Sequence, residues 1–331
     1  MKKKIFYPPK LNLEQTSSEI TAKYKASIIK GKTIADTTGG FGVDSYYFSE
    51  KFKTVHHFEI DKCLSKIAQY NFSVLNKTNI HCASENGISN IQNNQYDVIY
   101  SDPSRRHNLK GKVFFLNDCE PNIPKQLDAL LKHCPTILIK SSPMLDISVG
   151  IEELANVAEI HIIAVNNEVK ELLWLIKSGF NKSPIIKTIN FAKDNNELFN
   201  FEWLQNAEIS YSLPIKYLYE PNAAIMKSGA FNLIAERYSL HKLHKHTHLY
   251  TSDKLIGFPG RRFIINEVIP YQKKILKTNL HFTKANISIR NFPEKVSELR
   301  KKLKIKDGGN DYLFFTTSEN DKKLVLTCSK V

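Results

Sequence analysis

The stretch Thr33-Ile-Ala-Asp-Thr-Thr-Gly-Gly-Phe-Gly-Val-Asp44 decides the fold of this chain. A short apolar run ends on an acid, Asp36, and three glycines at 39, 40 and 42 lead into an apolar helical stretch. Glycines let the backbone turn sharply and let a ligand approach without meeting a Cβ atom. The first N–H groups of a helix lack internal partners and attract a negative group. The pattern predicts a strand, a ligand-binding turn and a helix start.

Strand and helix signals alternate on both sides of this stretch. Short, continuous apolar runs predict strands at 33–37, 54–60, 79–83, 96–101, 135–140, 159–166 and 184–191. Helices are predicted at 16–29, 43–52, 62–75, 123–133, 148–156 and 168–179. Such strands are typical of a parallel sheet covered on both faces. We therefore predict an α/β fold with a doubly wound, mostly parallel, seven-stranded Rossmann-like sheet, whose ligands bind at the carboxyl ends of the strands.

Polar residues follow the first three predicted strands at this edge. Glu59 comes after the second strand, where a carboxylate can accept hydrogen bonds from both hydroxyls of a ribose. Ser84 and Glu85 follow the third strand, where they can meet an adenine edge. The predicted cofactor-binding residues are Asp36, Thr38, Gly39, Gly40, Gly42, Val43, Asp44, Glu59, Ile60, Ser84 and Glu85. The alternative interpretation is a plain strand–helix turn followed by surface acids.

Two cofactors compete for this turn, a dinucleotide and S-adenosylmethionine. A dinucleotide fold requires G-x-G-x-x-G to seat a pyrophosphate, whereas this turn reads Asp-x-Thr-x-Gly-x-Gly from Asp36 to Gly42. An acid at the start of the turn would repel a pyrophosphate but would suit the ammonium group of a methionine moiety. The charge of the turn therefore favours S-adenosylmethionine.

These residues resemble a class I S-adenosylmethionine-dependent methyltransferase over about 16–192. The segments 14–26 (EQTSSEITAKYKA), 36–44 (DTTGGFGVD) and 101–106 (SDPSRR) resemble more narrowly a bacterial family with a C-terminal THUMP-like, ferredoxin-like domain. The resemblance implies cofactor binding and an RNA substrate. Known members carry residues upstream of the arm at 1–15, which implies that an N-terminal helical portion is missing from this sequence.

The end of the fourth predicted strand resembles the acceptor site of amino-methylating enzymes. Asp102 and Pro103 stand where those relatives keep an (Asn/Asp)-Pro-Pro-aromatic tetrad, whose acid and first proline carbonyl hold the target amine. Ser104 and Arg105 replace the second proline and the aromatic residue. We assign Asp102 and Pro103 as catalytic, and Arg105 and Arg106 as clamps for substrate phosphate. The alternative is that both arginines pair with acids of their own domain.

The chemistry of the acceptor is narrowed by the cysteines. Methylation at pyrimidine C5 needs a cysteine nucleophile, and none follows the fourth strand or the fifth, which ends Lys140-Ser-Ser-Pro143. We expect direct transfer to nitrogen or oxygen, which needs mainly alignment. Lys140 is either catalytic or a member of a salt bridge.

The five cysteines form no CxxC pair, which predicts reduced thiols and a cytoplasmic protein. We expect neither a membrane span nor a metal.

The net charge of +14 is concentrated in the C-terminal part of the chain. Residues 1–200 hold 25 Lys and Arg against 21 Asp and Glu, which leaves 22 against 12 for residues 201–331. A basic module attached to a near-neutral one indicates a polyanionic partner, RNA before membrane. The alternative is a Lys-rich composition without such a partner.

The C-terminal sequence predicts a small basic α/β domain. We expect an arm at 1–15, a methyltransferase domain at 16–192, a connecting region at 193–257 and a THUMP-like domain at 258–331. The connecting region is predicted to hold a helix at 223–238 and a solvated basic loop at 241–248 with four histidines. The segment 284–309 carries the THUMP-like resemblance, which implies RNA docking. We assign Lys301 and Lys302, on a basic helix face, to RNA binding.

Three functions remain open from the sequence. The first is an RNA methyltransferase acting on tRNA or rRNA, which co-purifying nucleic acid would support. The second is a methyltransferase of a protein or a small molecule, with the tail used only for packing. The third is an inactive cofactor- and RNA-binding protein, which the missing aromatic residue after Pro103 would explain.

Overall fold

The computed structural model describes residues 4–10, 13, 16–92, 94–105 and 115–331. Contacts divide the chain into two compact units. The first comprises Met1–Ile163, Val169–Lys187 and Asn200–Trp203, and the second comprises Ala164–Glu168, Thr188–Phe199 and Leu204–Val331. The expected domain boundaries stay predictions. The region expected to connect the domains, 193–257, contains strands that belong to the C-terminal sheet described below.

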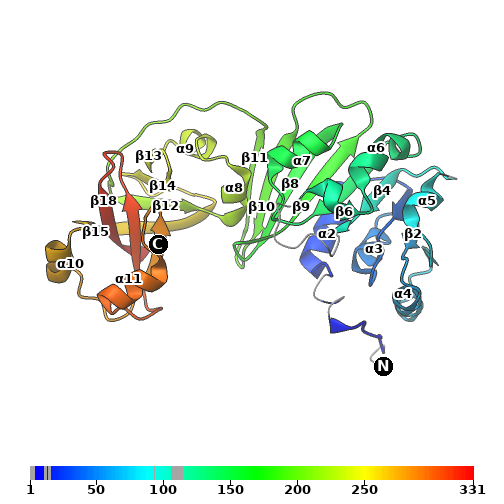
Figure 1. Ribbon diagram of the computed structural model, residues 1–331, viewed down its shortest axis with the longest axis horizontal. Coiled ribbons are helices and arrows are strands. Elements are labelled where there is room, and N and C mark those ends of the chain that lie inside the picture. Colours follow the sequence, from blue (N-terminus) through cyan, green and yellow to red (C-terminus); the bar gives the residue numbers. More distant parts are fainter. Residues whose placement is uncertain (1–3, 11–12, 14–15, 93, 106–114) are drawn as a thin grey trace. The chain divides into compact units, whose positions relative to one another are not determined.

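The larger sheet has nine strands in the order β11-β10-β8-β9-β7-β4-β1-β2-β3 (Figure 1). Their bounds are β1 (Thr33–Asp36), β2 (Thr54–Phe58), β3 (Ile80–Ala83), β4 (Val98–Ser101), β7 (Thr136–Ser141), β8 (Val157–Val165), β9 (Glu168–Lys177), β10 (Ile185–Phe191) and β11 (Asn196–Glu202). The five strands from β7 to β3 run parallel to one another. All seven predicted strands are present, and the predicted α/β, doubly wound, mostly parallel architecture is confirmed. Two further strands, β9 and β11, widen the sheet.

The predicted helix at 168–179 is wrong, because this segment forms strand β9, antiparallel to β7. Asn166 and Asn167 have φ angles of 50° and 64°, which suit the two-residue turn of a tight hairpin. This turn sends the chain directly back beside β8. The run Leu172–Ile176 is buried throughout, as expected of a central strand covered on both faces.

Five of the six helices predicted for this unit are present, with ends that differ from the predictions by up to four residues, and the short helix after β3 was not predicted. Their bounds are α2 (Glu19–Ile28), α3 (Val43–Phe48), α4 (Lys62–Val74), α5 (Gly87–Ile91), α6 (Ile123–Leu131) and α7 (Ile147–Glu153). A two-stranded ribbon joins β5 (Ser104–Arg105) to β6 (Cys119–Glu120). The N-cap of α2 is Ser18, whose hydroxyl accepts from the N–H of Thr21, so this helix begins at Glu19 rather than at residue 16 as predicted.

The N-terminal arm docks onto α4. The main chain of Phe6 exchanges two hydrogen bonds of 2.9 Å with the side chain of Asn71, which is 4% exposed. The Phe6 ring packs against Tyr70, and the Tyr7 ring lies 6.1 Å from Phe41 of the glycine turn. The arm is therefore held against the elements that carry the glycine turn.

The C-terminal sheet has seven strands in the order β13-β14-β12-β15-β18-β17-β16. Their bounds are β12 (Tyr217–Pro221), β13 (His241–His244), β14 (Thr247–Ser252), β15 (Gly260–Pro270), β16 (Asn286–Arg290), β17 (Asp311–Thr317) and β18 (Lys323–Lys330). The helices are α8 (Ala223–Ser228), α9 (Leu233–Arg237), α10 (Lys273–Asn279) and α11 (Val296–Leu303). Leu276 of α10 and Leu299 of α11 pack with Phe315 and Val325 in one cluster, so both helices cover the same face of the sheet (Figure 1).

Two predictions for the region before this domain are wrong. The expected solvated loop at 241–248 forms parts of β13 and β14, because Leu243 and Leu249 are buried in the sheet core. His244 is buried and contacts Asp321 at 3.0 Å. The expected helix at 223–238 is two short helices, since Gly229, with φ 74°, ends α8 in the left-handed region.

The described residues contain neither a membrane-spanning helix nor a metal-binding cluster. No helix there has the length and apolar content needed to cross a membrane. In the same part of the chain, no group of three or more His, Cys, Asp or Glu side chains has a geometry that could hold a metal ion.

Candidate functional site

A cavity of about 830 Å³ lies at the carboxyl edge of the larger sheet. Its walls come from the glycine turn after β1, the ends of β2, β4 and β7, and the β5–β6 ribbon. Most of the predicted cofactor-binding and catalytic residues line it, namely Asp36, Thr38, Gly39, Gly40, Gly42, Val43, Asp44, Glu59, Ile60, Asp102 and Pro103. The fold therefore brings residues from four separate strand ends to one cavity.

The glycine turn needs its glycines for two different reasons. Gly40 and Gly42 have φ angles of 55° and 88°, which residues other than glycine rarely adopt. A Cβ atom at Gly42 would also lie 2.4 Å from the Phe72 ring of α4. A Cβ atom at Gly39 would lie 2.3 Å from the buried ring of His57. The turn is thus packed tightly against α4 and β2.

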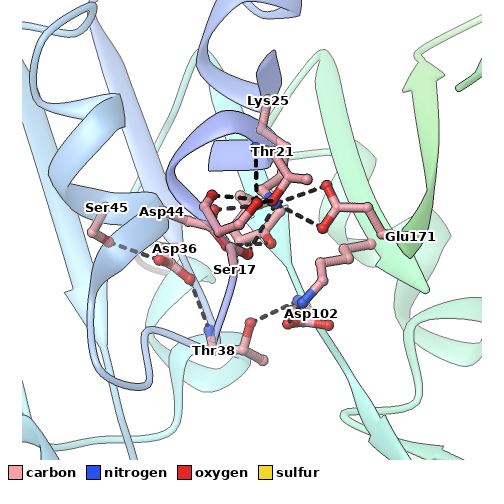
Figure 2. A network of polar contacts seen from close by, with 12 residues as sticks. Ser17, Thr21, Lys25, Asp36, Thr38, Asp44, Ser45, Asp102 and Glu171 are labelled. Carbon is pink, nitrogen blue, oxygen red and sulfur yellow. Dashed lines mark hydrogen bonds and ion pairs between the residues drawn. The ribbon is translucent and has the colours of Figure 1, made fainter. Parts of the chain in front are cut away.

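Asp36 lies beneath the turn and is 1% exposed. One carboxylate oxygen accepts from the Ser45 hydroxyl at 2.7 Å, and the other from the N–H of Thr38 at 3.2 Å. Figure 2 shows both contacts. Burial, together with the smaller effect of the Asp44 carboxylate, raises the pKa of Asp36 to about 7, although the hydrogen bonds from Ser45 and Thr38 lower it. The group is therefore poised to change charge near neutral pH, and a cation close to it would favour its ionised form.

Glu59 follows β2 and lines the same cavity as Asp36. Its two carboxylate oxygens accept from the N–H groups of Gly40 and Asp61, each at 2.8 Å. These contacts fix the carboxylate against the glycine turn. Each carboxylate oxygen can accept more than one hydrogen bond, so the group can still receive two hydroxyl donors.

The end of β3 is arranged differently from the prediction for an adenine edge. Ser84 and Glu85 are exposed and are not among the cavity-lining residues. Asn86 and Ile88, at the start of α5, line the cavity instead. The Asn86 side chain accepts from two N–H groups of α5, which fixes the start of that helix. Asn86 could have been predicted from the sequence, because an asparagine shortly after a strand is a common N-cap of the next helix.

Asp102, which follows β4, forms an ion pair with Lys140 near the end of β7. The Lys140 Nζ atom lies 2.5 Å from Asp102 Oδ2, and the Asp102 N–H donates to the Thr38 hydroxyl at 2.7 Å. Burial lowers the pKa of Lys140, but the carboxylates of Asp102, Asp44 and Glu171 outweigh it, so this pKa lies above its ordinary range. Of the two open interpretations of Lys140, the salt bridge is present, and it faces the cavity.

Of the two arginines predicted to clamp substrate phosphate, the structure describes Arg105 alone. Arg105 lines the cavity from the β5–β6 ribbon, where it pairs in register with Cys119. Arg106 lies outside the described residues. Glu120 and Pro121 line the cavity from the other side of the ribbon.

A buried charge cluster behind the cavity was not predicted from the sequence. Lys25 of α2 is fully buried, and its Nζ atom contacts both Glu171 oxygens at 2.9 and 3.0 Å and Asp44 at 3.2 Å. The hydroxyl groups of Ser17 and Tyr100 each donate a hydrogen bond of 2.8 Å to Asp44 Oδ2. Figure 2 shows the side chains of Ser17, Asp44 and Glu171 around Lys25. Lys25 thus holds α2 against the helix that follows the glycine turn and against β9.

Lys301 and Lys302 lie on α11 of the C-terminal unit, and both are exposed. Lys302 contacts Glu294 at 3.1 Å and the Tyr271 hydroxyl at 2.8 Å. Arg300 on the same helix contacts Asp307 at 2.5 Å. Part of the basic face is therefore paired with acids of its own unit.

Comparison with known proteins identifies the C-terminal part and the whole chain separately. A family described as a ferredoxin-like domain matches residues 217–259, and one described as THUMP domain-like matches 260–330. No curated protein matches the sequence. The predicted resemblance to a family with such a C-terminal domain is confirmed.

Several solved structures resemble the chain. A candidate methyltransferase of Escherichia coli shares 17% identity and a TM-score of 0.37, over 53% of this chain and 92% of its own. A candidate RNA methyltransferase of Pyrococcus horikoshii shares 21% identity and a TM-score of 0.31, over 43% of this chain and 69% of its own. A candidate methyltransferase of Porphyromonas gingivalis W83 shares 34% identity and a TM-score of 0.90, over 99% of this chain and 84% of its own. The chain therefore belongs to the family of this Porphyromonas gingivalis protein.

Proposed function

We propose that the protein is an S-adenosylmethionine-dependent methyltransferase of RNA, with tRNA or rRNA as substrate and a nitrogen or oxygen as acceptor. The observation that carries the proposal is the meeting of Asp36, Glu59 and Asp102 in one cavity. For direct methyl transfer, the carboxylates that bind the cofactor and the acid that holds the acceptor must lie within one site. The membership in the Porphyromonas gingivalis family supports methyl transfer as the reaction.

The residues of the cavity fit this cofactor in charge and shape. Asp36 and Asp44 are acids beside the glycine turn, which suits a cationic amino acid moiety. Glu59 is fixed where a ribose would find two acceptor oxygens. Ile60, which is 66% exposed, and Ile88 offer apolar contact for a base. When bound, the cofactor supplies an electrophilic methyl group that needs no further activation.

The chain's own residues would then hold the acceptor. Asp102 and Pro103 line the cavity beside Lys140, and Arg105 enters it from the ribbon. A guanidinium there suits a phosphate of the substrate backbone. The THUMP-like match at 260–330 and the excess of basic residues after residue 200 support RNA as the partner. We further propose a cytoplasmic location, which the free thiols of all five cysteines support.

Two measurements test the proposal. Titration calorimetry should detect binding of S-adenosylmethionine and of S-adenosylhomocysteine, but not of NAD, because the acid-led turn repels a pyrophosphate. Labelled methyl groups should be transferred to total RNA from a strain that lacks the gene. Binding of NAD alone, or transfer to protein but not to RNA, would contradict the proposal.

A further inference from the structure

Four charged side chains from four elements form two linked ion pairs behind and within the cavity. Lys140 of β7 and Asp102 after β4 form the outer pair, 14% and 32% exposed. Lys25 of α2 and Glu171 of β9 form the inner pair, 0% and 3% exposed. The outer pair lines the cavity and the inner pair does not. Burial raises the pKa of Glu171, and the ammonium groups of Lys25 and Lys140 both lower it, so the outer pair acts electrostatically on the inner one.

An ammonium group at the acceptor site favours one class of acceptor. An exocyclic amine attacks a methyl group with its protons in place, so positive charge develops on the nitrogen. A cation beside that nitrogen opposes the reaction. A hydroxyl group must release its proton, so negative charge develops on the oxygen. A fixed cation beside that oxygen stabilises the charge as it forms.

The residues that follow Pro103 point the same way. Enzymes that methylate a base must take it out of its stack, and they hold it between aromatic or apolar side chains. Here Ser104 and Arg105 follow Pro103 on strand β5, where an aromatic side chain would stand in the amino-methylating relatives. Arg105 can hold a backbone phosphate, which in RNA is next to the ribose rather than to the base edge.

We propose that Asp102 and Lys140 activate a hydroxyl group, and that the acceptor is the ribose 2′-hydroxyl of RNA. This inference rests on the proposed function and specifies its acceptor. The 2′-hydroxyl is present at every RNA nucleotide and is both a donor and an acceptor of hydrogen bonds. It can therefore donate to Asp102 while its oxygen faces the Lys140 ammonium.

The step balances with these two side chains. The acceptor oxygen uses a lone pair to form the new carbon–oxygen bond, and the electron pair of the broken carbon–sulfur bond stays on the departing sulfur. The hydroxyl proton passes to Asp102, which later releases it to water. Lys140 holds Oδ2 of this carboxylate, so Oδ1 is the oxygen that receives the proton. Thr38 fixes the backbone of Asp102 during the transfer.

The inner pair acts as a positioning pair rather than a catalytic one. Glu171 forms the ion pair with the buried Lys25. Burial lowers the pKa of Lys140, but the negative charge of Glu171 adds to those of Asp102 and Asp44, and together they raise this pKa above its ordinary range. Asp44 joins the two pairs, since it contacts Lys25 and raises the pKa of Lys140. Lys140 therefore acts as a fixed cation and leaves the base to Asp102.

The product of the reaction tests the inference. Labelled methyl groups are transferred to total RNA from a strain that lacks the gene, and the RNA is then digested with alkali and with nucleases. We expect label in alkali-resistant dinucleotides and in a ribose-methylated nucleoside, because a 2′-O-methyl group blocks alkaline cleavage. Label only in base-methylated, alkali-labile nucleosides would overturn the inference and leave the proposed function intact. Transfer to no RNA would overturn the proposed function, and the inference with it.

Variants of the outer pair give a second, independent readout. Lys140→Met and Asp102→Asn should each lower kcat by about 100-fold or more while affinity for the cofactor stays within threefold, and Lys140→Arg should retain more activity. Lys177→Met is the matched control, because Lys177 pairs in register with Thr136 at the opposite end of β7. For an amine acceptor, Asp102→Asn would keep most activity, since an amide oxygen accepts the same hydrogen bond. Near-normal kcat in both Lys140→Met and Asp102→Asn would overturn the inference. Should a variant fail to fold, the product analysis of the unaltered protein decides.

Discussion

Two ion pairs, one from each unit, differ in how far water reaches them. Lys25 and Glu171 in the first unit are 0% and 3% exposed. Lys302 and Glu294 on the C-terminal unit are 48% and 29% exposed. A buried pair is costly to break, because one partner then remains charged without compensation. An exposed pair contributes little and can exchange its partner. The Lys25–Glu171 pair therefore fixes a local geometry, whereas the exposed charge of Lys302 on α11 can exchange its partner for a polyanion.

The largest effect should come from removing the buried cation. Lys25→Met leaves Glu171 and Asp44 buried without their partner, so the free energy of unfolding should fall by about 3–5 kcal/mol in urea denaturation. Lys23→Met, which breaks the exposed pair with Glu19 on the same helix, is the matched control and should leave stability almost unchanged. Equal losses in both variants would remove the distinction between buried and exposed pairs.

The next effect concerns the carboxylate that fixes the glycine turn. Glu59→Ala removes the acceptors of the Gly40 and Asp61 N–H groups and those offered to a ribose. We expect affinity for S-adenosylmethionine to fall by about 10- to 100-fold in titration calorimetry, since a hydrogen bond to a charged group contributes about 1.5–3 kcal/mol. Glu50→Ala, at an exposed acid paired with Lys77, should bind as the unaltered protein does. Unchanged binding by Glu59→Ala would place the ribose elsewhere.

A smaller effect should depend on pH. Because the pKa of Asp36 is raised to about 7, the group is largely neutral at pH 5.5 and ionised at pH 8. Affinity for the cationic cofactor should rise about tenfold between pH 5.5 and pH 7.5, with release of a proton, which calorimetry in buffers of different ionisation enthalpy measures. Asp36→Asn should give a flat profile. An equally steep profile in this variant would assign the titration to another group.

The same shift affects folding with the opposite dependence on pH. The Asp36 carboxyl group binds its proton more tightly in the folded protein than in the unfolded chain. Without cofactor, the free energy of unfolding should therefore fall as the pH rises from about 4 to about 7, and this contribution should be constant above that range.

The smallest effect should come from the exposed basic face. Changing Lys301 and Lys302 together to Ala should weaken RNA binding a few-fold for all sequences and flatten its dependence on salt. Lys302→Ala alone should matter less, because Lys302 is paired with Glu294. The exposed Lys51 and Lys53 of the first unit, changed together to Ala, are the control. Filter binding across a salt series measures the slope, and an unchanged slope would remove these lysines from the interface.

Local patterns were sufficient for most of the sheet and for one wall of the cavity. The apolar strands and the glycines at 39, 40 and 42 carry their own geometry, so the turn and its acids could be predicted. Strand β9 was missed because a continuous apolar run suits a buried strand and a helix equally. The Asn166-Asn167 pair was the missing signal, since both residues adopt positive φ in the hairpin turn.

Side-chain contacts between residues far apart in sequence could not be predicted from local patterns. Lys25 and Glu171 are 146 residues apart in sequence. Lys25 lies in the segment 14–26 that carries the family resemblance, but nothing in that segment points to Glu171 as its partner. Lys140 and Asp102 are 38 residues apart, and only the parallel pairing of β4 with β7 brings their strand ends together. His244 ends β13 and Asn291 follows β16, and these two strands stand at opposite ends of the strand order, so their side-chain contact depends on the course of the whole C-terminal sheet. Such pairs depend on topology, which periodicity alone does not determine.

The position of Lys25 has a practical consequence for anyone who wishes to trim the protein. A fragment that starts at the first strand of the sheet, near residue 33, would look complete by the usual outline of such folds. It would nevertheless lack the only lysine that contacts Glu171 within the described residues, and both Glu171 and Asp44 would have to be solvated or protonated. Workable boundaries for an isolated first unit therefore begin before Ser17 and extend beyond β9.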